Sequence, residues 1–433
     1  MYRVDYAVDV WGLLTNPATS RLEELRADCK DMNAFIGHEF GDTVAWLASM
    51  RCTATLRVLD LKNCDLESPP LEQSSPGLAL PCLTSLGLRD CVLSHGYLQQ
   101  LVDAAPALAS LRLENVRHDS LEPTAYSWLH FQLRCPMVSD FVLDTTCQHQ
   151  MNKDELAPSS GGAIDLDMPN LRFFRYRGFA ARLSLRSPTP KLARVDLDGS
   201  CREGCPDWCK FKGELKVRLP RMLTGLWQTR VLKLRVPCIE DLLAAVLPVF
   251  PNLDVLDLEG EYKCNNKKTA EAMATLLASC PAVSKIRLRL SMKQEFRWDQ
   301  ERDFDGEQIA RRSFRRSVER LKRFSSPSFH CAAEDGCEIS EHAALSQRTF
   351  SCLENSLRVV VLQFKVKELN SFVVQLTKFL AENALHLEEM RIDDGIQVYS
   401  DLCCTVRGYG YGDTAIRYFQ KTAIREYGKP KIS

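Results

Sequence analysis

The sequence has no long apolar run. Its longest apolar stretches, such as residues 242–250, are far shorter than the roughly 20 residues that a membrane-spanning helix needs, so we expect no membrane partner. Near the beginning, Asp5 and Asp9 interrupt the region where a secretory signal would need an unbroken apolar core. We therefore expect an intracellular protein, located in the cytoplasm, the nucleus or both.

Net charge, histidine and catalytic motifs are also scarce or absent. The 56 Lys and Arg residues balance the 56 Asp and Glu residues, so no overall field would draw the chain to nucleic acid. Only eight histidines occur, and none lies in a G-x-S-x-G nucleophile motif or an H-E-x-x-H zinc motif. We expect no enzymatic activity, no cofactor, no metal ligands and no nucleic-acid partner.

What is present is the composition of a folded, water-soluble chain. Of the 433 residues, 45% are apolar and 26% are charged, which differs clearly from disordered and membrane proteins. The length allows about three ordinary domains or one array of repeats. In a reducing compartment, the 18 cysteines would behave as small apolar residues rather than as a disulfide framework.

A sequence repeat decides between these two architectures. Residues 56–66 read LRVLDLKNCDL and residues 83–93 read LTSLGLRDCVL, and both fit the leucine-rich-repeat pattern Leu-x-x-Leu-x-Leu-x-x-Cys-x-Leu at every fixed position. Ten looser copies bring the total to twelve units, which begin mostly 21 to 34 residues apart; these copies start at Leu22, Leu108, Val138, Leu171, Leu192, Thr229, Leu253, Val283, Leu357 and Leu387. The sequence thus predicts an α/β leucine-rich-repeat solenoid, a curved horseshoe of short parallel strands with returning helices and turns.

Side-chain alternation assigns the positions within each unit. Successive side chains of a strand point to opposite faces, so both leucines of Leu-x-Leu enter the stack between layers, and the intervening residues line the outer, concave side. We expect Cys64 and Cys91 to fill a buried slot in the turn beneath the strand. The same reasoning predicts full burial of Leu59, Leu61, Leu86 and Leu88.

The segments between the strands predict short helices and three interruptions. Leucines and other apolar residues recur at a spacing of 3 to 4 in the expected helices, at residues 97–105, 239–247, 269–279 and 369–380. The repeat period breaks at residues 145–167, which we expect to be a flexible loop, at residues 199–226, and at residues 292–352. The last of these segments is charge-rich, so we expect a loop with one solvated helix. Limited proteolysis should cut the chain in this segment first.

These boundaries give a domain map. The charged insertion separates the main array from the last repeats and from a short terminal segment. We therefore expect a solenoid over residues 1–291, the insertion over residues 292–352, last repeats that complete the solenoid over residues 353–400, and a C-terminal cap segment over residues 401–433.

Three motifs could carry chemistry, and each has a plainer interpretation. Cys201, Cys205 and Cys209 could offer three thiolates to zinc, but no second ligand pair lies nearby, so we favour free thiols. The glycines of RGYGYGD at residues 407–413 lack the Lys-Ser or Lys-Thr ending of a phosphate loop. The basic run at residues 311–323 could bind nucleic acid or direct nuclear import, but the acidic half before it can neutralise it, which favours a solvated helix.

The chain resembles plant F-box proteins that carry leucine-rich repeats and a C-terminal module called FBD. The resemblance rests on the cysteine-type repeats, on phrases such as MPNLRFFRYRG and FPNLDVLDLEG before the strands, and on residues 357–392, which look like the strand, helix and strand of FBD. It extends over residues 11–392. It implies an FBD-like region at residues 353–400, and protein binding of the kind performed by the substrate-recognition part of F-box ubiquitin-ligase subunits.

One departure from this family concerns recruitment of the ligase. Family members begin with an F-box that docks on the Skp-type adaptor of a cullin ligase, and here the opening phrase already looks like repeats. We expect the adaptor and the cullin ligase as partners only if an F-box is present in the full-length form. The alternative is an F-box-less scaffold or decoy that binds the same target without a role in ubiquitination.

Charge alternates between neighbouring units on the predicted concave side. Positions three, five and seven of each unit point there, and parallel strands lie about 4.8 Å apart, so basic and acidic rows can pair laterally. The rows are Arg175 and Arg177, then Asp196 and Asp198, then Lys233 and Arg235, then Asp257 and Glu259, then Lys285, Arg287 and Arg289. The sequence predicts a charge ladder across the middle of this side.

The ladder ends beside an apolar row, because the strand after the last basic row offers Val359, Val361 and Gln363 instead of acids. A basic row next to an apolar one is a plausible protein-binding surface, unless the acidic half of the insertion covers it as a lid. The predicted partner-binding residues are Lys285, Arg287, Arg289, Val359 and Val361, with Arg175 and Arg177 as further candidates. The repeats do not name the target, because such scaffolds hold many partners on interchangeable surface residues.

Overall fold

A computed structural model of the chain divides into two compact units, residues 1–229 and residues 230–433. The residues that the structure describes are 16–28, 50–66, 78–93, 95–116, 130–145, 163–178, 182–199, 219, 222–244, 247–262, 266–292, 345, 348–364 and 371–393.

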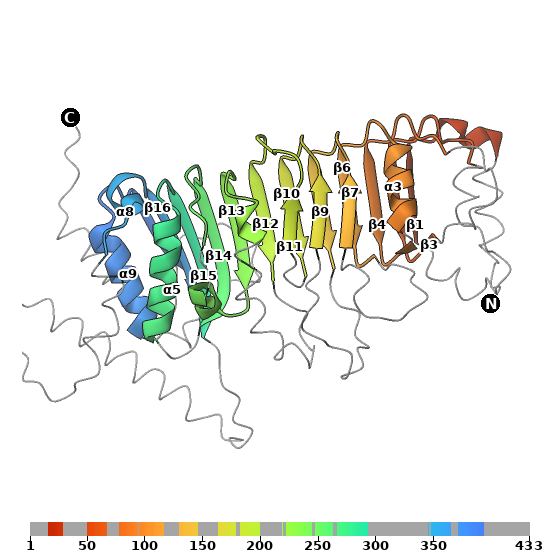
Figure 1. Ribbon diagram of the computed structural model, residues 1–433. Helices are drawn as coiled ribbons and strands as arrows, with labels where there is room; N and C mark the ends of the chain where they lie inside the picture. The colour runs from red at the N-terminus through yellow and green to blue at the C-terminus, as the bar shows by residue number, and fades with distance from the viewer. Residues whose placement is uncertain are drawn as a thin grey trace, which may run out of the picture. The chain divides into compact units, whose positions relative to one another are not determined.

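The first unit contains parallel strands that follow one another in chain order (Figure 1). Each strand occupies the Leu-x-Leu part of one predicted repeat. The strands are β1 (Glu24–Asp28), β2 (Val58–Lys62), β4 (Ser85–Arg89), β6 (Ser110–Glu114), β8 (Asp140–Asp144), β10 (Phe173–Arg177) and β12 (Arg194–Asp198).

The second unit has the same pattern, with five parallel strands that follow one another in chain order. They are β13 (Val231–Val236), β14 (Val255–Tyr262), β15 (Lys285–Met292), β16 (Val359–Phe364) and β17 (Glu389–Asp393). The described residues thus hold twelve strands of this kind, one for each predicted repeat. The prediction of an α/β leucine-rich-repeat fold is confirmed.

The leucines of neighbouring strands are stacked in register. Leu86 of β4 lies opposite Leu59 of β2 and Leu111 of β6. Predicted core residues Leu59, Leu61 and Leu88 are fully buried, and Leu86 is 1% exposed. This burial of apolar surface is the main favourable term for the stack, and the predicted register is confirmed.

The turn after each strand follows the same plan in the first three complete repeats. Asn63, Asp90 and Asn115 have positive φ angles of 54°, 51° and 54°, a conformation that Asn and Asp tolerate better than other non-glycine residues. The Asn115 side chain donates to the Asp90 carboxylate at 2.5 Å. The next residues, Cys64 and Cys91, are buried as predicted, so this turn places a polar residue outside and a small apolar one inside.

Gly178, the residue after β10, has a backbone conformation that residues with side chains rarely adopt. Its φ is +146°, and a Cβ added there would lie 2.0 Å from the Oγ1 atom of Thr145. The Gly178 amide donates to the Asp198 carbonyl at 3.0 Å, which continues the backbone ladder to β12. Only glycine fits this position without moving the neighbouring turn.

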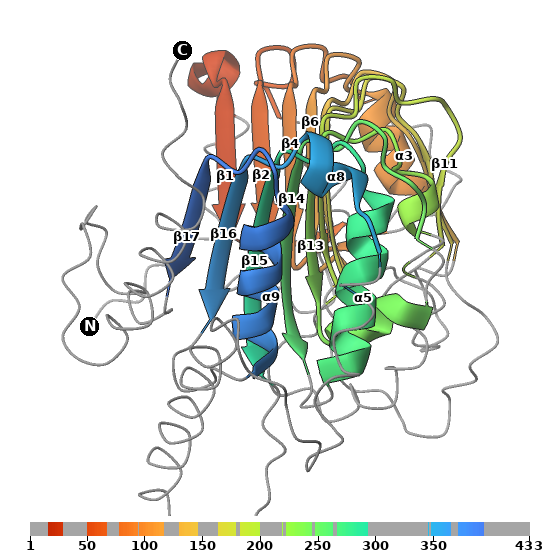
Figure 2. The same ribbon diagram turned by 90° about the vertical axis from the view of Figure 1, so that its left-hand side faces the viewer.

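Helices form several of the return segments, close to the predicted ranges. The helix α3 (His95–Asp103), the helix α5 (Asn266–Ser279) and the helix α9 (Ser371–Asn383) agree with three predicted helices, while the fourth range contains a 3-10 helix, η3 (Ile239–Ala244). A shorter helix, α8 (Ser351–Asn355), precedes β16. In the second unit, α5 and α9 contact each other and lie on one side of the strands (Figures 1 and 2).

The first unit also returns through strands, which the sequence analysis missed. A second parallel sheet joins β7 (His130–Arg134), β9 (Ala163–Asp167) and β11 (Arg182–Leu185), and a two-stranded pair joins β3 (Asp65–Leu66) and β5 (Val92–Leu93). The prediction of a flexible loop over residues 145–167 is therefore wrong at residues 163–167. Ile164 and Leu166 are buried, as expected for apolar side chains that alternate along a strand.

Several predicted features lie outside the described residues. These are the cysteines Cys201, Cys205 and Cys209, the acidic and basic halves of the charged insertion, the glycine-rich stretch and the terminal segment at residues 401–433. At the two ends of the insertion, β15 extends through Met292 and α8 begins at Ser351.

Candidate functional site

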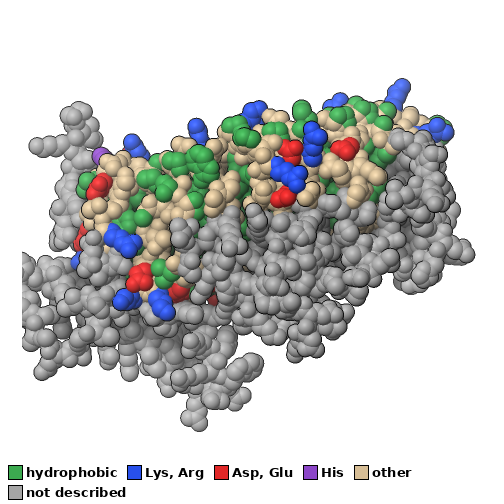
Figure 3. All heavy atoms as spheres, in the orientation of Figure 1, with side chains coloured by type: hydrophobic (Ala, Val, Ile, Leu, Met, Phe, Trp, Pro, Cys, Tyr) green, Lys and Arg blue, Asp and Glu red, His purple; other side chains and the backbone are tan. Residues whose placement is uncertain are grey.

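Within each compact unit, the side chains at positions three, five and seven of the repeats lie on one face of the parallel strands, which we call the open face. It corresponds to the predicted concave side. In the second unit, the helices lie on the opposite face of the strands. The described side chains on this helix-bearing side are a mixture of apolar, basic and acidic groups (Figure 3). Alternation along each strand therefore separates the apolar core from a polar face.

Charges on the open face of the first unit pair laterally, as predicted. The Arg175 guanidinium lies 3.1 Å from the Asp196 carboxylate, and Arg177 lies 3.5 Å from Asp198 and 3.8 Å from Asp144. Asp196 is only 5% exposed and also accepts two hydrogen bonds from Arg194, at 2.8 and 3.0 Å. The two candidate binding residues of this unit, Arg175 and Arg177, are thus already partnered by carboxylates.

The same pairing occurs in the second unit between β14 and its neighbours. Arg235 of β13 lies 3.1 Å from Glu259. From the other side, Arg289 of β15 lies 2.8 Å from Glu259 and 3.2 Å from Asp257, and Arg287 lies 3.6 Å from Asp257. The predicted lateral pairing is confirmed within each unit, and the two acids of β14 lie between two basic rows.

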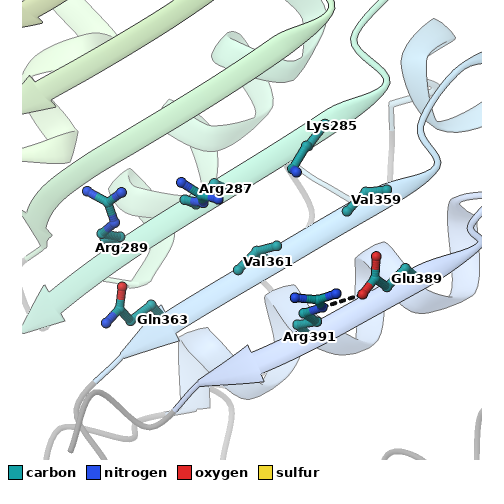
Figure 4. A pocket seen from close by; sticks show the side chains of 8 residues that line it. All are labelled: Lys285, Arg287, Arg289, Val359, Val361, Gln363, Glu389 and Arg391. Atoms are coloured by element: carbon teal, nitrogen blue, oxygen red, sulfur yellow. Dashed lines mark hydrogen bonds and ion pairs between the residues drawn. The ribbon is translucent and has the colours of Figure 1, made fainter. Parts of the chain in front are cut away.

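A pocket of about 310 Å³ lies on the open face over the last three strands (Figure 4). Its sides come from β15 and β17, and its floor from β16. We call it the β15–β17 pocket; it is lined by Lys285, Arg287, Arg289, Val359, Val361, Gln363, Glu389 and Arg391. The structure therefore brings together the five residues of the second unit that the sequence analysis singled out.

Strand register explains how these residues meet. Arg287 of β15 is opposite Val361 of β16, which is opposite Arg391 of β17. In the row before, Lys285, Val359 and Glu389 are aligned in the same way. Val359 and Val361 are half-buried, so an apolar strip remains reachable between two charged sides.

The three cations of β15 differ in how firmly they are held. Arg289 donates hydrogen bonds to Glu259 and Asp257 at 2.8 and 3.2 Å, so its guanidinium is held against the acids of β14. Arg287 approaches Asp257 only to 3.6 Å, which is beyond hydrogen-bonding distance. For Lys285, the structure gives no ion pair within the described residues.

Two charged residues of the pocket were missed by the sequence analysis: Glu389 and Arg391. The signal was available, because the repeat at Leu387 places positions three and five at Glu389 and Arg391. These two side chains form an ion pair along β17. The interpretation that the ladder ends at an apolar row is thus incomplete, since β17 supplies a further charged row beyond Val359 and Val361.

The described ranges contain neither a group of metal ligands nor a helix that could span a membrane. There, no three His, Cys, Asp or Glu side chains are grouped closely enough to hold a metal ion. The helices in the same part of the chain are all too short or too polar to cross a membrane.

Comparison with known proteins supports the repeat assignment over part of the chain. Residues 10–151 match a family model described as "FBD-associated F-box protein At5g56370, LRR repeats". No curated protein and no solved structure matches the chain. The matched region is about a third of the sequence and includes the strands from β1 to β8. Together with the parallel strands of each unit, it makes this chain a leucine-rich-repeat protein whose residues 10–151 are similar to the LRR repeats of an FBD-associated F-box protein.

Proposed function

We propose that this chain binds a protein target through the β15–β17 pocket and serves as the substrate-recognition part of an F-box ubiquitin-ligase subunit. The observation that carries the binding role is the half-buried pair Val359 and Val361 between charged rows from two neighbouring strands. We further propose that the chain is a binding module rather than an enzyme, and that it acts in the cytoplasm or the nucleus.

The composition of the pocket suits a protein surface. Protein interfaces are enriched in arginine and combine an apolar centre with a polar rim. Here the centre is the valine pair of β16, and the rim includes Arg287 and Arg391. The pocket is open to solvent on a sheet face rather than enclosed in a deep cavity, which favours a macromolecular partner over a small molecule enclosed on all sides.

The first experiment is affinity capture of target proteins from a cell extract, with two charge-reversal variants. Arg287→Glu should weaken capture, because it places an acid beside the valine pair. Arg235→Glu is the matched control, since Arg235 also lies near a carboxylate on the same face and its side chain is 45% exposed, against 41% for Arg287. Loss with both variants, or with neither, would contradict the proposed site.

The ligase role needs a separate experiment, because it is supported by the similarity of residues 10–151 to F-box-associated repeats. The chain would be expressed in two forms, unmodified and fused to an F-box. Each form would be tested for recovery of a Skp-type adaptor and for loss of the captured target. We expect the fused form to recover the adaptor and to lower target abundance. Target binding without any fall in abundance would instead favour a scaffold or decoy.

A further inference from the structure

The β15–β17 pocket contains one row that is suited to an anionic group. In this row, Val361 is flanked on both sides by arginines, Arg287 from β15 and Arg391 from β17. Neighbouring parallel strands are about 4.8 Å apart, so the two Cα atoms are separated by roughly 10 Å. Both guanidiniums can therefore reach a group that lies above Val361 (Figure 4).

Cations outnumber acids in the pocket. Its lining has four cationic side chains and one acidic side chain, Glu389. The acids of β14 reduce this excess mainly at Arg289, which donates hydrogen bonds to both Asp257 and Glu259. Hydrogen-bonding capacity remains at Lys285, at Arg287 and at Arg391, whose ion pair with Glu389 is formed by Nε and leaves its other N–H donors available. A ligand that approaches these cations should carry negative charge.

The dimensions indicate an extended peptide. The three floor residues Val359, Val361 and Gln363 are successive same-face positions of β16, about 6.6 Å apart, so the floor is roughly 13 Å long. This length corresponds to about four residues of extended chain. Because side chains of an extended peptide alternate, two ligand side chains separated by one residue would face the floor.

From these observations we propose that the pocket binds an extended segment of the target in which a glutamate lies over Val361 and an apolar residue two positions away lies over Val359. The methylene groups of the glutamate contact Val361, while its carboxylate accepts hydrogen bonds from Arg287 and Arg391. The proposal rests on the protein-binding function proposed above and specifies the chemistry of the partner.

Glutamate suits the site better than its nearest alternatives. Aspartate has one methylene group fewer to cover Val361 and a shorter reach to the two guanidiniums. A phosphate group would bring a charge of about −2 next to Glu389, which lines the same pocket. Binding of a single carboxylate needs only that Arg391 exchange or share its ion pair with Glu389.

The experiment begins with selection of a random heptapeptide phage library on the full chain. The enriched peptides are then labelled with fluorescein, and their Kd values are measured by fluorescence polarisation. We expect a glutamate with an apolar residue two positions before or after it. Replacing that glutamate by glutamine, or introducing Arg287→Gln or Arg391→Gln, should weaken binding about 10- to 100-fold, as expected for loss of charge-assisted hydrogen bonds.

Two further variants make the result interpretable. Arg235→Gln is the matched control and should change Kd less than about 3-fold. Val361→Glu places a carboxylate between Arg287 and Arg391, so it should abolish peptide binding while the melting temperature stays close to that of the unchanged chain. Enriched peptides without an acidic residue, equal Kd values for Arg287→Gln and Arg235→Gln, or tighter binding of a phosphoserine peptide would overturn the inference.

Failure of this inference can be told apart from failure of the proposed function. If capture of the target protein depends on Arg287 while the selected peptides show no preference for glutamate, only the glutamate assignment is wrong. If Arg287→Glu captures the same proteins in the same amounts as the unchanged chain, the pocket is not the recognition site at all.

Discussion

Replacement of Leu86 by alanine tests the repeat stack at its best-defined position. Leu86 is 1% exposed in β4, and its register partners Leu59 and Leu111 are fully buried. The substitution removes three carbon groups at about 0.8 kcal/mol each, or about 2.4 kcal/mol of transfer free energy. A residual cavity of about 50 Å³ would add about 1.2 kcal/mol, at about 24 cal/mol per Å³.

We therefore expect Leu86→Ala to lower the free energy of unfolding by about 2 to 4 kcal/mol. The site should collapse only partly, because β4 is bonded in register to a strand on each side. The assay is chemical denaturation followed by far-ultraviolet circular dichroism. Met137→Ala is the control in the same unit: Met137 is 56% exposed, so its removal should cost less than about 0.5 kcal/mol.

A loss below about 0.5 kcal/mol for Leu86→Ala would refute this reasoning, because the side chain could not then lie between the layers. Equal losses for Leu86→Ala and Met137→Ala would have the same meaning. A loss in the predicted range would support the alternation that also assigns residues to the open face.

Three further predictions concern other parts of the fold. Asp196→Asn should destabilise the first unit by about 1 to 3 kcal/mol in the same assay, because a buried carboxylate acceptor of arginine hydrogen bonds loses its charge. Gly178→Ala should cost at least about 1 kcal/mol, since its φ of +146° is strained for alanine. Among described cysteines, exposed Cys82 should react with iodoacetamide first at pH 8, because burial raises the thiol pKa of Cys135 and Cys238 to about 12.

Each of these predictions has its own control. Glu24→Gln breaks an exposed ion pair with Arg26. It should change the free energy of unfolding much less than Asp196→Asn does. Thr145→Ala should recover only part of the loss caused by Gly178→Ala, because it removes the 2.0 Å contact but not the backbone strain. Mass spectrometry that finds Cys135 labelled in the native chain as fast as Cys82 would contradict the burial of Cys135.

The raised thiol pKa values also fix the sign of a pH effect. In the unfolded chain, thiols ionise near their ordinary pKa of about 8.5, whereas burial keeps the folded Cys238 protonated up to about 12. The unfolded state therefore loses protons first, and the free energy of unfolding should fall as pH rises from about 9 to 12. Denaturation midpoints that stay constant over this interval, or that rise, would contradict this prediction.

Periodicity predicted the main sheet well because one cause determines both pattern and fold. Leucines such as Leu59 and Leu86 must enter the stack, and their spacing fixes each strand and its register. The second sheet was harder to predict, because β9 and β11 contain only short alternations of apolar and polar residues. β9 also lies in a segment where the repeat period is interrupted. Ile164 and Leu166, just before Met168 and Pro169, were the available signal.

For the candidate site, the sequence predicted which residues share a face, but not how firmly each side chain is held. Arg287 and Arg289 occupy equivalent positions in the pattern. However, Arg289 forms two hydrogen bonds to the acids of β14, whereas Arg287 lies 3.6 Å from the Asp257 carboxylate. This difference depends on side-chain conformation across strands, which spacing alone does not contain. The row with Arg391 could have been assigned from the repeat at Leu387.

Site-specific photocrosslinking tests the central claim most directly. A benzoylphenylalanine would replace Val361 in the pocket or, as the control, Val255, a half-buried valine on the open face of β14. After irradiation with captured target, we predict a covalent adduct from position 361 and none from position 255. An adduct from position 255 alone, or from neither position while capture persists, would contradict recognition through the β15–β17 pocket.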